Sequence, residues 1–407
     1  MGLQLCQLCE IAYFVTDKIP LENVLLTDYV TTDSLLPNKE GRCVAQNLPP
    51  QKCALTHYKC GDVLVANIRP YLKKIWFADR EGGASADVLV FRAKSGHSQE
   101  FLYALLLQDT FYDYVMKGKK GSKMPRGDRD QIMRYSIPKL SLAEEACIGN
   151  MILSFCTKVN VNRLINDNLE AMAKQLYDYW FVQFDFPNEE GKPYKSSGGA
   201  MVWNEKLKRE IPSSFEVVNM GKLCDFRNGI NYSKDETGND YQIVNVRNIS
   251  SSRILLDGED FDVITVPTSK AGNYVLKPDD IIIARSGCPG STRLLLSPAN
   301  TLFCGFIICC SPNDSRMRNY LVYCLKQLEG TNATTSGGSI LQNVSQDTLK
   351  GLHVIVPEKQ IIDKFNKTIE LIFARMLNCL KESKALTKQR NELLPLLMNG
   401  QASINSD

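Results

Sequence analysis

The sequence has few of the residues on which enzyme active sites are commonly built. Its 407 residues include only three His, which stand in unrelated contexts at His57, His97 and His353. The chain has no G-x-x-x-x-G-K-[ST] phosphate loop, no G-x-S-x-G nucleophile turn and no H-E-x-x-H zinc motif. ATPases, serine hydrolases and zinc proteases depend on these motifs, so these classes lose their support.

Strong charge of one sign and long apolar runs are also missing. There are 48 Lys and Arg against 45 Asp and Glu, a net charge of +3, which excludes a uniformly basic surface. Nucleic-acid binding would therefore have to come from local basic patches. The longest apolar runs, such as Phe303–Cys310, are far shorter than the roughly 18 residues that a membrane span needs.

Cysteine is present, but not in a pattern that binds metal. Cys6 and Cys9 form a single C-x-x-C pair, without a second pair at zinc-finger spacing. Several of the fourteen Cys lie in apolar runs, where a reduced thiol behaves as a small hydrophobe. The start of the chain also lacks the basic stretch of a secretory signal. We expect a cytoplasmic protein with reduced cysteines and no metal.

What the sequence does contain is an internal repeat, since segments from the first half recur in the same order in the second. The first of these segments is an acidic turn followed by a short apolar strand, and the second is a short amphipathic helix. The matching pairs are Gly61–Arg69 with Asp279–Gly287, Glu100–Leu106 with Asn319–Leu325, Gly121–Met124 with Gly338–Leu341, and Tyr135–Pro138 with Val354–Pro357.

The repeat predicts two copies of one α+β domain with a curved, mainly antiparallel sheet. Short apolar runs bounded by Gly, Pro, Asn and Asp mark the strands. We expect strands at Val24–Leu26, Val63–Ala66 and Val88–Phe91 in the first copy, and at Val217–Val218, Tyr241–Val246, Ile281–Ala284 and Phe303–Cys309 in the second.

A long helical pattern without Pro follows each copy, from Ala143 to Trp180 and from Lys359 to Leu394. At 1.5 Å per residue, roughly 36–38 residues give helices of about 55 Å. A narrow apolar seam over that length favours two antiparallel helices packed as in a coiled coil, although separate helices, each on its own domain, would also fit. The seam residues, which would dock partner proteins or pack the helices on each other, are Phe155, Val159, Leu169, Leu176, Phe365, Ile369, Ile372, Met376 and Leu380.

These patterns divide the chain into alternating globular and helical parts. The predicted order is a globular domain (1–139), a long helix (140–184), a linker rich in Gly, Pro and Ser (185–210), a second globular domain (211–357), a second long helix (358–400) and a short tail (401–407).

Local positive charge is the chemical signal that remains. The loop Lys117–Arg129 carries six cations against Asp128 alone, and its Gly and Ser residues would let phosphates approach the backbone. Asn, Gln and Ser side chains in the second half suit base edges. A solvated basic loop is the plainer alternative. The candidate DNA-binding residues are Arg69, Lys73, Lys74, Lys119, Lys120, Lys123, Arg126, Arg227, Asn228, Arg247, Asn248, Arg285, Ser339, Gln342 and Asn343.

The order of these parts and several phrases resemble the specificity subunit of Type I restriction-modification systems over essentially the whole chain. The resemblance rests on Leu176–Phe181 followed by Phe184–Pro187, on Ile211–Glu216, on Asp279–Gly287 and on Leu393–Gln401. It implies two target-recognition domains, each of which reads one half of a split, asymmetric sequence in double-stranded DNA. The long helices would hold the two domains at a fixed distance. The first half shows no clear counterpart of the Ile211–Glu216 opening.

The resemblance also implies that this chain is not itself catalytic and holds no cofactor. Two methyltransferase subunits would dock on the helices, bind S-adenosylmethionine and flip out a target adenine. Restriction subunits would add translocation and cleavage, with ATP and magnesium bound to partner subunits.

Two other functions stay open at this point. One is a stand-alone nuclease or modification enzyme with a duplicated fold. Pro278-Asp279 could begin the motif of a metal-dependent nuclease, but no Glu-x-Lys or Asp-x-Lys follows at a convincing distance. A scaffold that binds proteins instead of DNA would leave the basic loop incidental.

Overall fold

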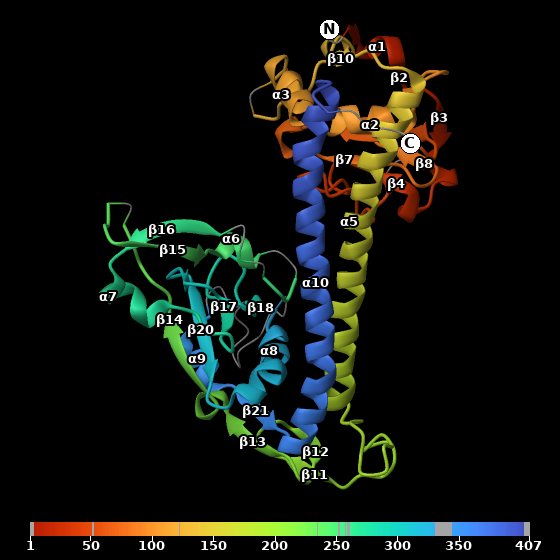
Figure 1. Cartoon of the computed structure of the whole chain (residues 1–407). Helices are drawn as coiled ribbons and strands as arrows, with labels where there is room; N and C mark the ends of the chain where they lie inside the picture. Colours follow the sequence, from red (N-terminus) through yellow and green to blue (C-terminus); the bar gives the residue numbers. More distant parts are fainter. Residues whose placement is uncertain are drawn as a thin grey trace. The chain divides into compact units, whose positions relative to one another are not determined.

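The computed structural model describes residues 4–50, 53–121, 123–233, 235–250, 253–256, 258, 261–329 and 344–402. They fall into two compact units (Figure 1). Unit 1 is Met1–Arg163 with Lys381–Asp407, and unit 2 is Leu164–Leu380. Each unit thus contains one globular domain and one end of both long helices.

Unit 1 is built on an antiparallel sheet of four strands, whose central strand reads Val-Leu-Val-Ala and is buried along its whole length. Such a continuous apolar run is typical of a strand covered on both faces. The strands of this sheet lie in the order β2 (Ala12–Phe14), β9 (Val88–Ala93), β6 (Val63–Ala66) and β7 (Ile75–Phe77).

Two smaller sheets and four short helices complete the globular part of unit 1. One sheet has the order β3 (Lys18–Pro20), β5 (Ala54–Tyr58), β8 (Gly82–Ala84) and β4 (Tyr29–Val30), and the other pairs β1 (Leu5–Gln7) with β10 (Ser136–Pro138). The helices are α1 (Leu8–Ile11), α2 (Gln99–Leu107), α3 (Asp109–Lys117) and α4 (Arg129–Met133).

Unit 2 repeats the four-stranded antiparallel sheet with the same connections. Its order is β14 (Cys224–Asn228), β20 (Ile307–Pro312), β17 (Ile281–Ala284) and β18 (Thr292–Leu294). The other strands are β16 (Asp262–Val266), β15 (Asn239–Val244) and β19 (Thr301–Phe303) in one sheet, β13 (Glu216–Asn219) with β21 (His353–Val356), and the hairpin β11 (Met201–Asn204) with β12 (Arg209–Pro212). The helices are α6 (Val246–Ile249), α7 (Thr268–Ala271), α8 (Arg318–Lys326) and α9 (Gln346–Gly351).

The matched topology extends to the opening strand that the sequence comparison did not find. In unit 2, β13 follows Ile211–Phe215 and pairs antiparallel with β21. In unit 1, β1 pairs antiparallel with β10 in the same way. The first copy therefore has a counterpart of β13, namely β1, which is three residues long, but not of the Ile211–Phe215 segment before it.

The long helices are α5 (Leu142–Tyr177), which continues into a π-helical turn at Asp178–Val182, and α10 (Lys359–Met398). They pack together and run antiparallel, because a residue later in α5 contacts a residue earlier in α10. In unit 1 the Asn162 amide donates to Glu382 (2.8 Å), and in unit 2 the Asn166 amide donates to the carbonyl of Met376 (3.2 Å). Both Asn side chains are buried, and buried polar groups of this kind fix the register of a helix pair.

Two local strand predictions were wrong. Val24–Leu26 is not a strand, because Val24 and Leu25 connect two 3-10 turns at Leu21–Asn23 and Leu26–Asp28. The run Phe303–Cys309 is two strands, β19 and β20, separated by a tight turn in which Ile307 N donates to Cys304 O (2.9 Å).

Candidate nucleic-acid interface

Both units form the same backbone corner where the central strand β6 or β17 ends. In unit 1, Asn67 N donates to Asp87 O (2.8 Å) and Gly127 N donates to Asn67 O (3.3 Å). We call these three residues corner 1. In unit 2 the corresponding bonds run from Arg285 N to Phe306 O (2.9 Å) and from Val344 N to Arg285 O (3.0 Å).

Arg285, Phe306 and Val344 form corner 2. After each corner the chain turns into a short helix with a side-chain cap. Asp128 accepts hydrogen bonds from the first turn of α4, and Ser345 accepts one from Thr348 N of α9. The two corners therefore share one frame of backbone hydrogen bonds but carry different side chains.

The two basic patches of the first half meet at corner 1. Ile68 and Arg126 form an isolated antiparallel bridge, and Arg69 N donates to Pro125 O (2.8 Å). A second bridge joins Lys120 to Arg126, which closes the loop on itself. Patches that are about fifty residues apart in the sequence thus form one basic surface, as DNA binding requires.

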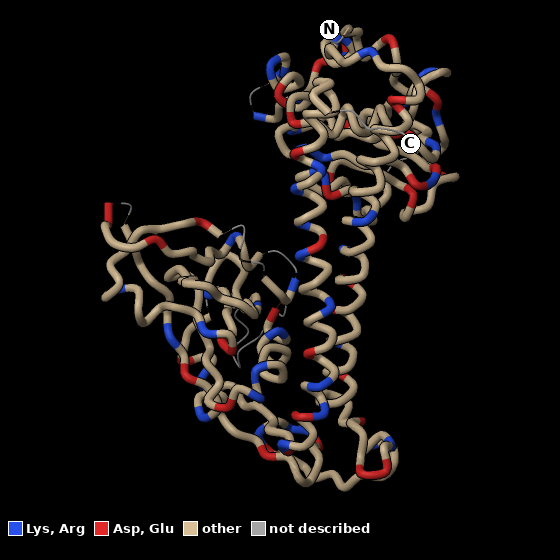
Figure 2. Tube along the Cα trace, viewed as in Figure 1, with Lys and Arg blue, Asp and Glu red and all other residues tan. Residues whose placement is uncertain are grey.

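Three cations on this surface are exposed and form no ion pair with any residue that the structure describes: Arg69, Lys119 and Lys123. In Figure 2 the loop beyond α3 carries Lys and Arg on both sides of the short grey trace. The other four candidates of unit 1 are held by neighbours: Lys73 by Asp109 (2.7 Å), Lys74 by the carbonyl of Thr32 (2.5 Å), Lys120 by Asp128 (2.5 Å) and Arg126 by Asp87 (3.1 Å).

In unit 2 the structure gives Arg227 a structural position. Its guanidinium donates to the carbonyls of Asn273 and Val275 (both 3.1 Å) and to the carboxylate of Asp280. Its side chain is 29% exposed, so only part of the group faces solvent. Arg227 therefore fixes the loop that precedes β17, and its capacity for further contacts is limited.

The remaining candidates of unit 2 divide into engaged and exposed residues. Arg247 pairs with Asp262, and the Asn248 side chain accepts from Asn245 N (2.8 Å) at the start of α6. Asn228 and Arg285 are exposed at the strand ends beside corner 2. Ser339, Gln342 and Asn343 lie outside the described residues.

A surface hollow lies at the end of β14. It has a volume of about 650 Å³ and is lined by Arg227, Asn228, Asn273, Tyr274, Lys277 and Gln346, together with Gly272. In the orientation that satisfies both ends of the Gln346 amide, its nitrogen donates to Phe226 O and its oxygen accepts from Asn228 N (both 3.1 Å). The lining is rich in residue types that read base edges and bind phosphate.

Unit 1 has a smaller hollow at the matching place, the end of β2. It measures about 130 Å³, and its polar lining is Thr16, Lys18, Thr56 and Arg129. Arg129 is the first residue of α4 as Gln346 is the first residue of α9. Arg129 stands out in the sequence only as one cation of the basic loop, and Gln346 does not stand out at all, because only the folded sheet places them beside a strand end.

A buried aspartate precedes the central strand in each unit. Asp62 is 1% exposed and receives two hydrogen bonds of 2.7 Å from the Arg92 guanidinium, while Asp280 is 3% exposed and pairs with Arg227. Each carboxylate also accepts a backbone N–H three residues upstream, from Lys59 (2.7 Å) or Lys277 (2.8 Å). The arginine that pairs with the buried aspartate lies on β9 in unit 1 and on β14 in unit 2.

Comparison with known proteins gives a family match in the second half and similar proteins over most of the chain. Residues 212–394 match the family described as Type I restriction modification DNA specificity domain. The specificity subunit of Type I restriction enzyme HindI from Haemophilus influenzae is 24% identical over 441 residues, which cover 92% of this chain and 94% of the relative. Over nearly its whole length the chain is therefore similar to specificity subunits of Type I restriction-modification systems.

One further relative and one solved structure are similar to this chain. The specificity subunit of Type I restriction enzyme MjaIX from Methanocaldococcus jannaschii is 24% identical over 318 residues, which cover 76% of this chain and 71% of the relative. A crystal structure of the S subunit of a Type I restriction-modification system from M. genitalium shares the fold, with a TM-score of 0.58 and 14% identity. That match covers 100% of this chain and 97% of the other.

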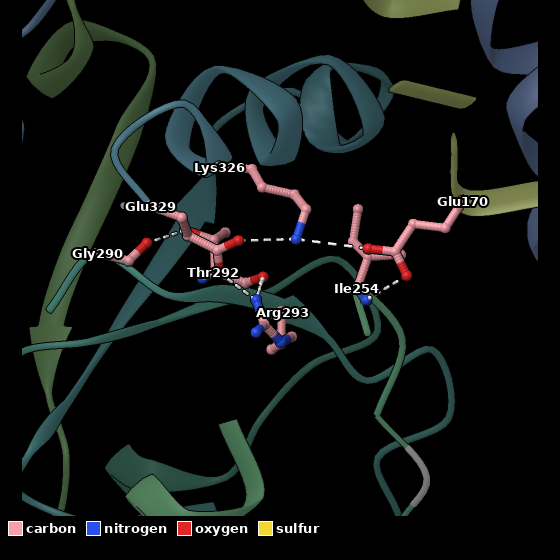
Figure 3. A network of polar contacts seen from close by, with 7 residues as sticks. All are labelled: Glu170, Ile254, Gly290, Thr292, Arg293, Lys326 and Glu329. Atoms are coloured by element: carbon pink, nitrogen blue, oxygen red, sulfur yellow. Dashed lines mark hydrogen bonds and ion pairs between the residues drawn. The ribbon is translucent and has the colours of Figure 1, made fainter. Parts of the chain in front are cut away.

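In unit 2 a network of charges attaches the globular part to α5 (Figure 3). Glu170 of α5 lies 3.4 Å from the Lys326 ammonium of α8, which in turn lies 2.8 Å from Glu329. Glu329 also binds the guanidinium of Arg293 and accepts from Thr292 N (2.9 Å). The network therefore links α5, α8 and β18 through alternating charges.

Glu329 is the centre of this network. Burial alone would raise the pKa of Glu329, but hydrogen bonds from Lys326 and Arg293 hold the pKa below its ordinary value. A carboxyl group with a depressed pKa in the folded state stabilises the fold at neutral pH. This contribution is lost as the pH falls through the folded-state pKa.

Glu329→Gln is therefore expected to lower the free energy of unfolding at pH 7 by about 2 kcal/mol, because Arg293 is 2% exposed and would lose its carboxylate. The variant should also lose stability less steeply than the wild type below pH 5. Urea unfolding of the full chain at several pH values measures both effects. The matched control is Glu205→Gln, whose partner Lys208 is exposed, and a loss above about 0.5 kcal/mol there would show that the effect is not specific.

The residues singled out on the long helices lie mostly inside the units. Phe365, Ile369 and Met376 are at most 1% exposed in the core of unit 2. Leu169, Leu176, Ile372 and Leu380 pack against the same core, Phe155 packs against the core of unit 1, and Val159 is half-buried. The large apolar side chains that these helices expose are different ones: Leu142, Val161, Leu164, Met172, Leu371 and Leu396.

The described residues contain no group of three or more His, Cys, Asp and Glu placed to hold a metal ion. Among the described helices, none is both long enough and apolar enough to cross a membrane.

Proposed function

We propose that this chain reads DNA sequence in a Type I complex, and that each unit reads one half of a split, asymmetric site. The observation that carries the proposal is the pair of matched corners. Each corner combines one backbone frame with exposed groups that suit phosphates or bases, such as Arg69 and Lys119 in unit 1 and Asn228 and Arg285 in unit 2. Different side chains on one frame are what two readers of different sequences need.

The long helices would set the gap between the half-sites and dock two methyltransferase subunits. The buried Asn162 and Asn166 side chains support the first role, because they fix how the two helices slide along each other. Exposed apolar residues such as Val161, Met172 and Leu371 support the second, because a partner that docks on the helices would bury them. The seam residues predicted from sequence would contribute by holding the helices together.

The chain would act without a catalytic group or cofactor of its own. S-adenosylmethionine would bind to the methyltransferase subunits, and ATP and magnesium would bind to the restriction and translocase subunits. The assembly would work on double-stranded DNA in the cytoplasm.

Mapping adenine methylation tests this function. A host expressing this chain with its methyltransferase subunit is compared with the same host lacking this chain. We expect a split motif with a constant gap only when this chain is present. If a soluble complex forms and no motif appears, or if the isolated chain cleaves DNA with magnesium, the proposal fails.

Exchanging residues 215–355 for those of another family member tests the division of labour. Only the half-site read by unit 2 should change, and the gap should stay constant. A change in both half-sites would contradict one reader per unit.

A further inference from the structure

Corner 2 exposes an aromatic side chain that the described fold leaves largely unburied. All sixteen Phe of the chain are among the described residues, and Phe306 is the only one classed as exposed, with 63% of its surface accessible. Its neighbours Phe303 and Ile307 are fully buried. The chain therefore turns one Phe outward between two buried strands.

The turn that presents Phe306 is held on both sides. Ile307 N donates to Cys304 O (2.9 Å), and Arg285 N donates to the carbonyl of Phe306 itself (2.9 Å). A Cβ at Gly305 would lie 2.2 Å from the Asn231 side-chain oxygen, so a larger residue there would require the Asn231 side chain to move. Phe306 therefore projects from a fixed turn and not from a loose loop.

The surroundings of Phe306 favour nucleic acid as its partner. Arg285 is exposed and bonded to it through the backbone, and Asn228 ends the neighbouring strand at the same edge of the sheet. The hollow beside this edge adds Lys277 and Gln346. Cations and amides around one apolar side chain match the phosphates, base edges and thymine methyl groups of DNA.

Unit 1 places a different residue on the same frame. The position that matches Phe306 in corner 1 is Asp87, whose carboxylate pairs with Arg126 (3.1 Å). Unit 1 instead exposes an aromatic ring in the segment after β6, at Tyr71 (51%), two residues beyond the exposed Arg69. An exposed arginine and an exposed aromatic residue thus lie near both corners, but the two aromatic residues come from different segments of the fold.

We propose that Phe306 contacts the base pairs of the half-site read by unit 2 and contributes to its specificity, with Arg285 binding the adjacent phosphate backbone. Apolar side chains act in this way by touching thymine methyl groups or by wedging between base steps. The inference rests on the proposed function of this chain, and it assigns a specificity-determining residue to unit 2.

The test uses the complex with the methyltransferase subunits and a duplex carrying the motif that the wild-type complex methylates. Phe306→Ala should weaken binding to this duplex by about 10-fold, and binding to unrelated DNA by less than about twofold. In methylation maps the half-site of unit 2 should become relaxed and that of unit 1 should not change. Phe306→Leu, which keeps an apolar side chain, should retain more of the specificity than Phe306→Ala.

Trp203→Ala is the matched control, because Trp203 is an aromatic residue of unit 2 that is 55% exposed on β11. It should leave affinity and motif unchanged. An unaltered motif and affinity for Phe306→Ala would overturn the inference while the proposed function stands. Loss of complex assembly by Phe306→Ala would also overturn it, because Phe306 would then dock a protein. Failure of the proposed function itself would appear separately, as a wild-type complex that methylates no split motif.

Discussion

Replacing Asp280 with Ala is expected to lower the free energy of unfolding by about 3 kcal/mol, because Arg227 would keep its half-buried position without a carboxylate. The substitution also removes the acceptor for Lys277 N (2.8 Å) and for the Ser311 hydroxyl (2.5 Å). Urea unfolding of the full chain, followed by circular dichroism, measures the effect.

The neighbouring residue provides the control. The Asp279 side chain is 47% exposed, and its contact with Arg318 is long at 3.4 Å. Asp279→Ala should therefore change the free energy of unfolding by no more than about 0.5 kcal/mol. Equal losses for the two variants would show that burial and pairing of Asp280 do not stabilise unit 2.

Removing the two exposed lysines of the unit 1 loop, by Lys119→Ala with Lys123→Ala, is expected to weaken DNA binding by the assembled complex by roughly 50-fold at 0.1 M salt. Each lysine that neutralises a phosphate adds about 0.9 to the slope of log affinity against log salt, so the slope should fall by about 2. A salt titration of affinity on a cognate duplex measures both quantities.

Lys192→Ala with Lys208→Ala removes the same charge from exposed positions in unit 2 that already pair with Glu190 and Glu205. This control should leave the slope unchanged. A single Lys120→Ala change should have a smaller effect than either lysine of the main pair, because Lys120 lies 2.5 Å from Asp128. If the Lys119 and Lys123 double variant keeps the wild-type slope, the loop does not contact phosphates.

The repeat and the long helices could be predicted because their signals are local and recur. Strands β6 and β17 are short apolar runs after an acidic turn, and the apolar positions of α5 and α10 return every three or four residues. Strand β1 could not be identified, because its pairing with β10 joins residues more than a hundred positions apart and its three residues carry no pattern.

The candidate site was only partly predictable, since a sequence shows charge but not burial. Arg227 and Arg285 look alike in the sequence, yet one is bonded to Asp280 and the other is exposed. Phe306 lies within an apolar run that predicts a buried strand, and only Gly305 hinted at the turn that exposes it. Arg69 lies near Arg126 because of the long-range bridge between Ile68 and Arg126, which no local sequence pattern predicts.

The different origin of the arginine that neutralises each buried aspartate restricts how the two domains can be recombined. Asp62 takes its arginine from β9, the neighbour of β6 in the sheet, whereas Asp280 takes it from β14, one strand further away. A chimera in which β2 replaces β14 in unit 2 would leave Asp280 without its arginine. The reverse chimera would crowd Arg92 and the transplanted Arg227 around Asp62. Crossovers between copies are therefore expected to disturb folding when they separate β9 from the segment before β6, or β14 from the segment before β17.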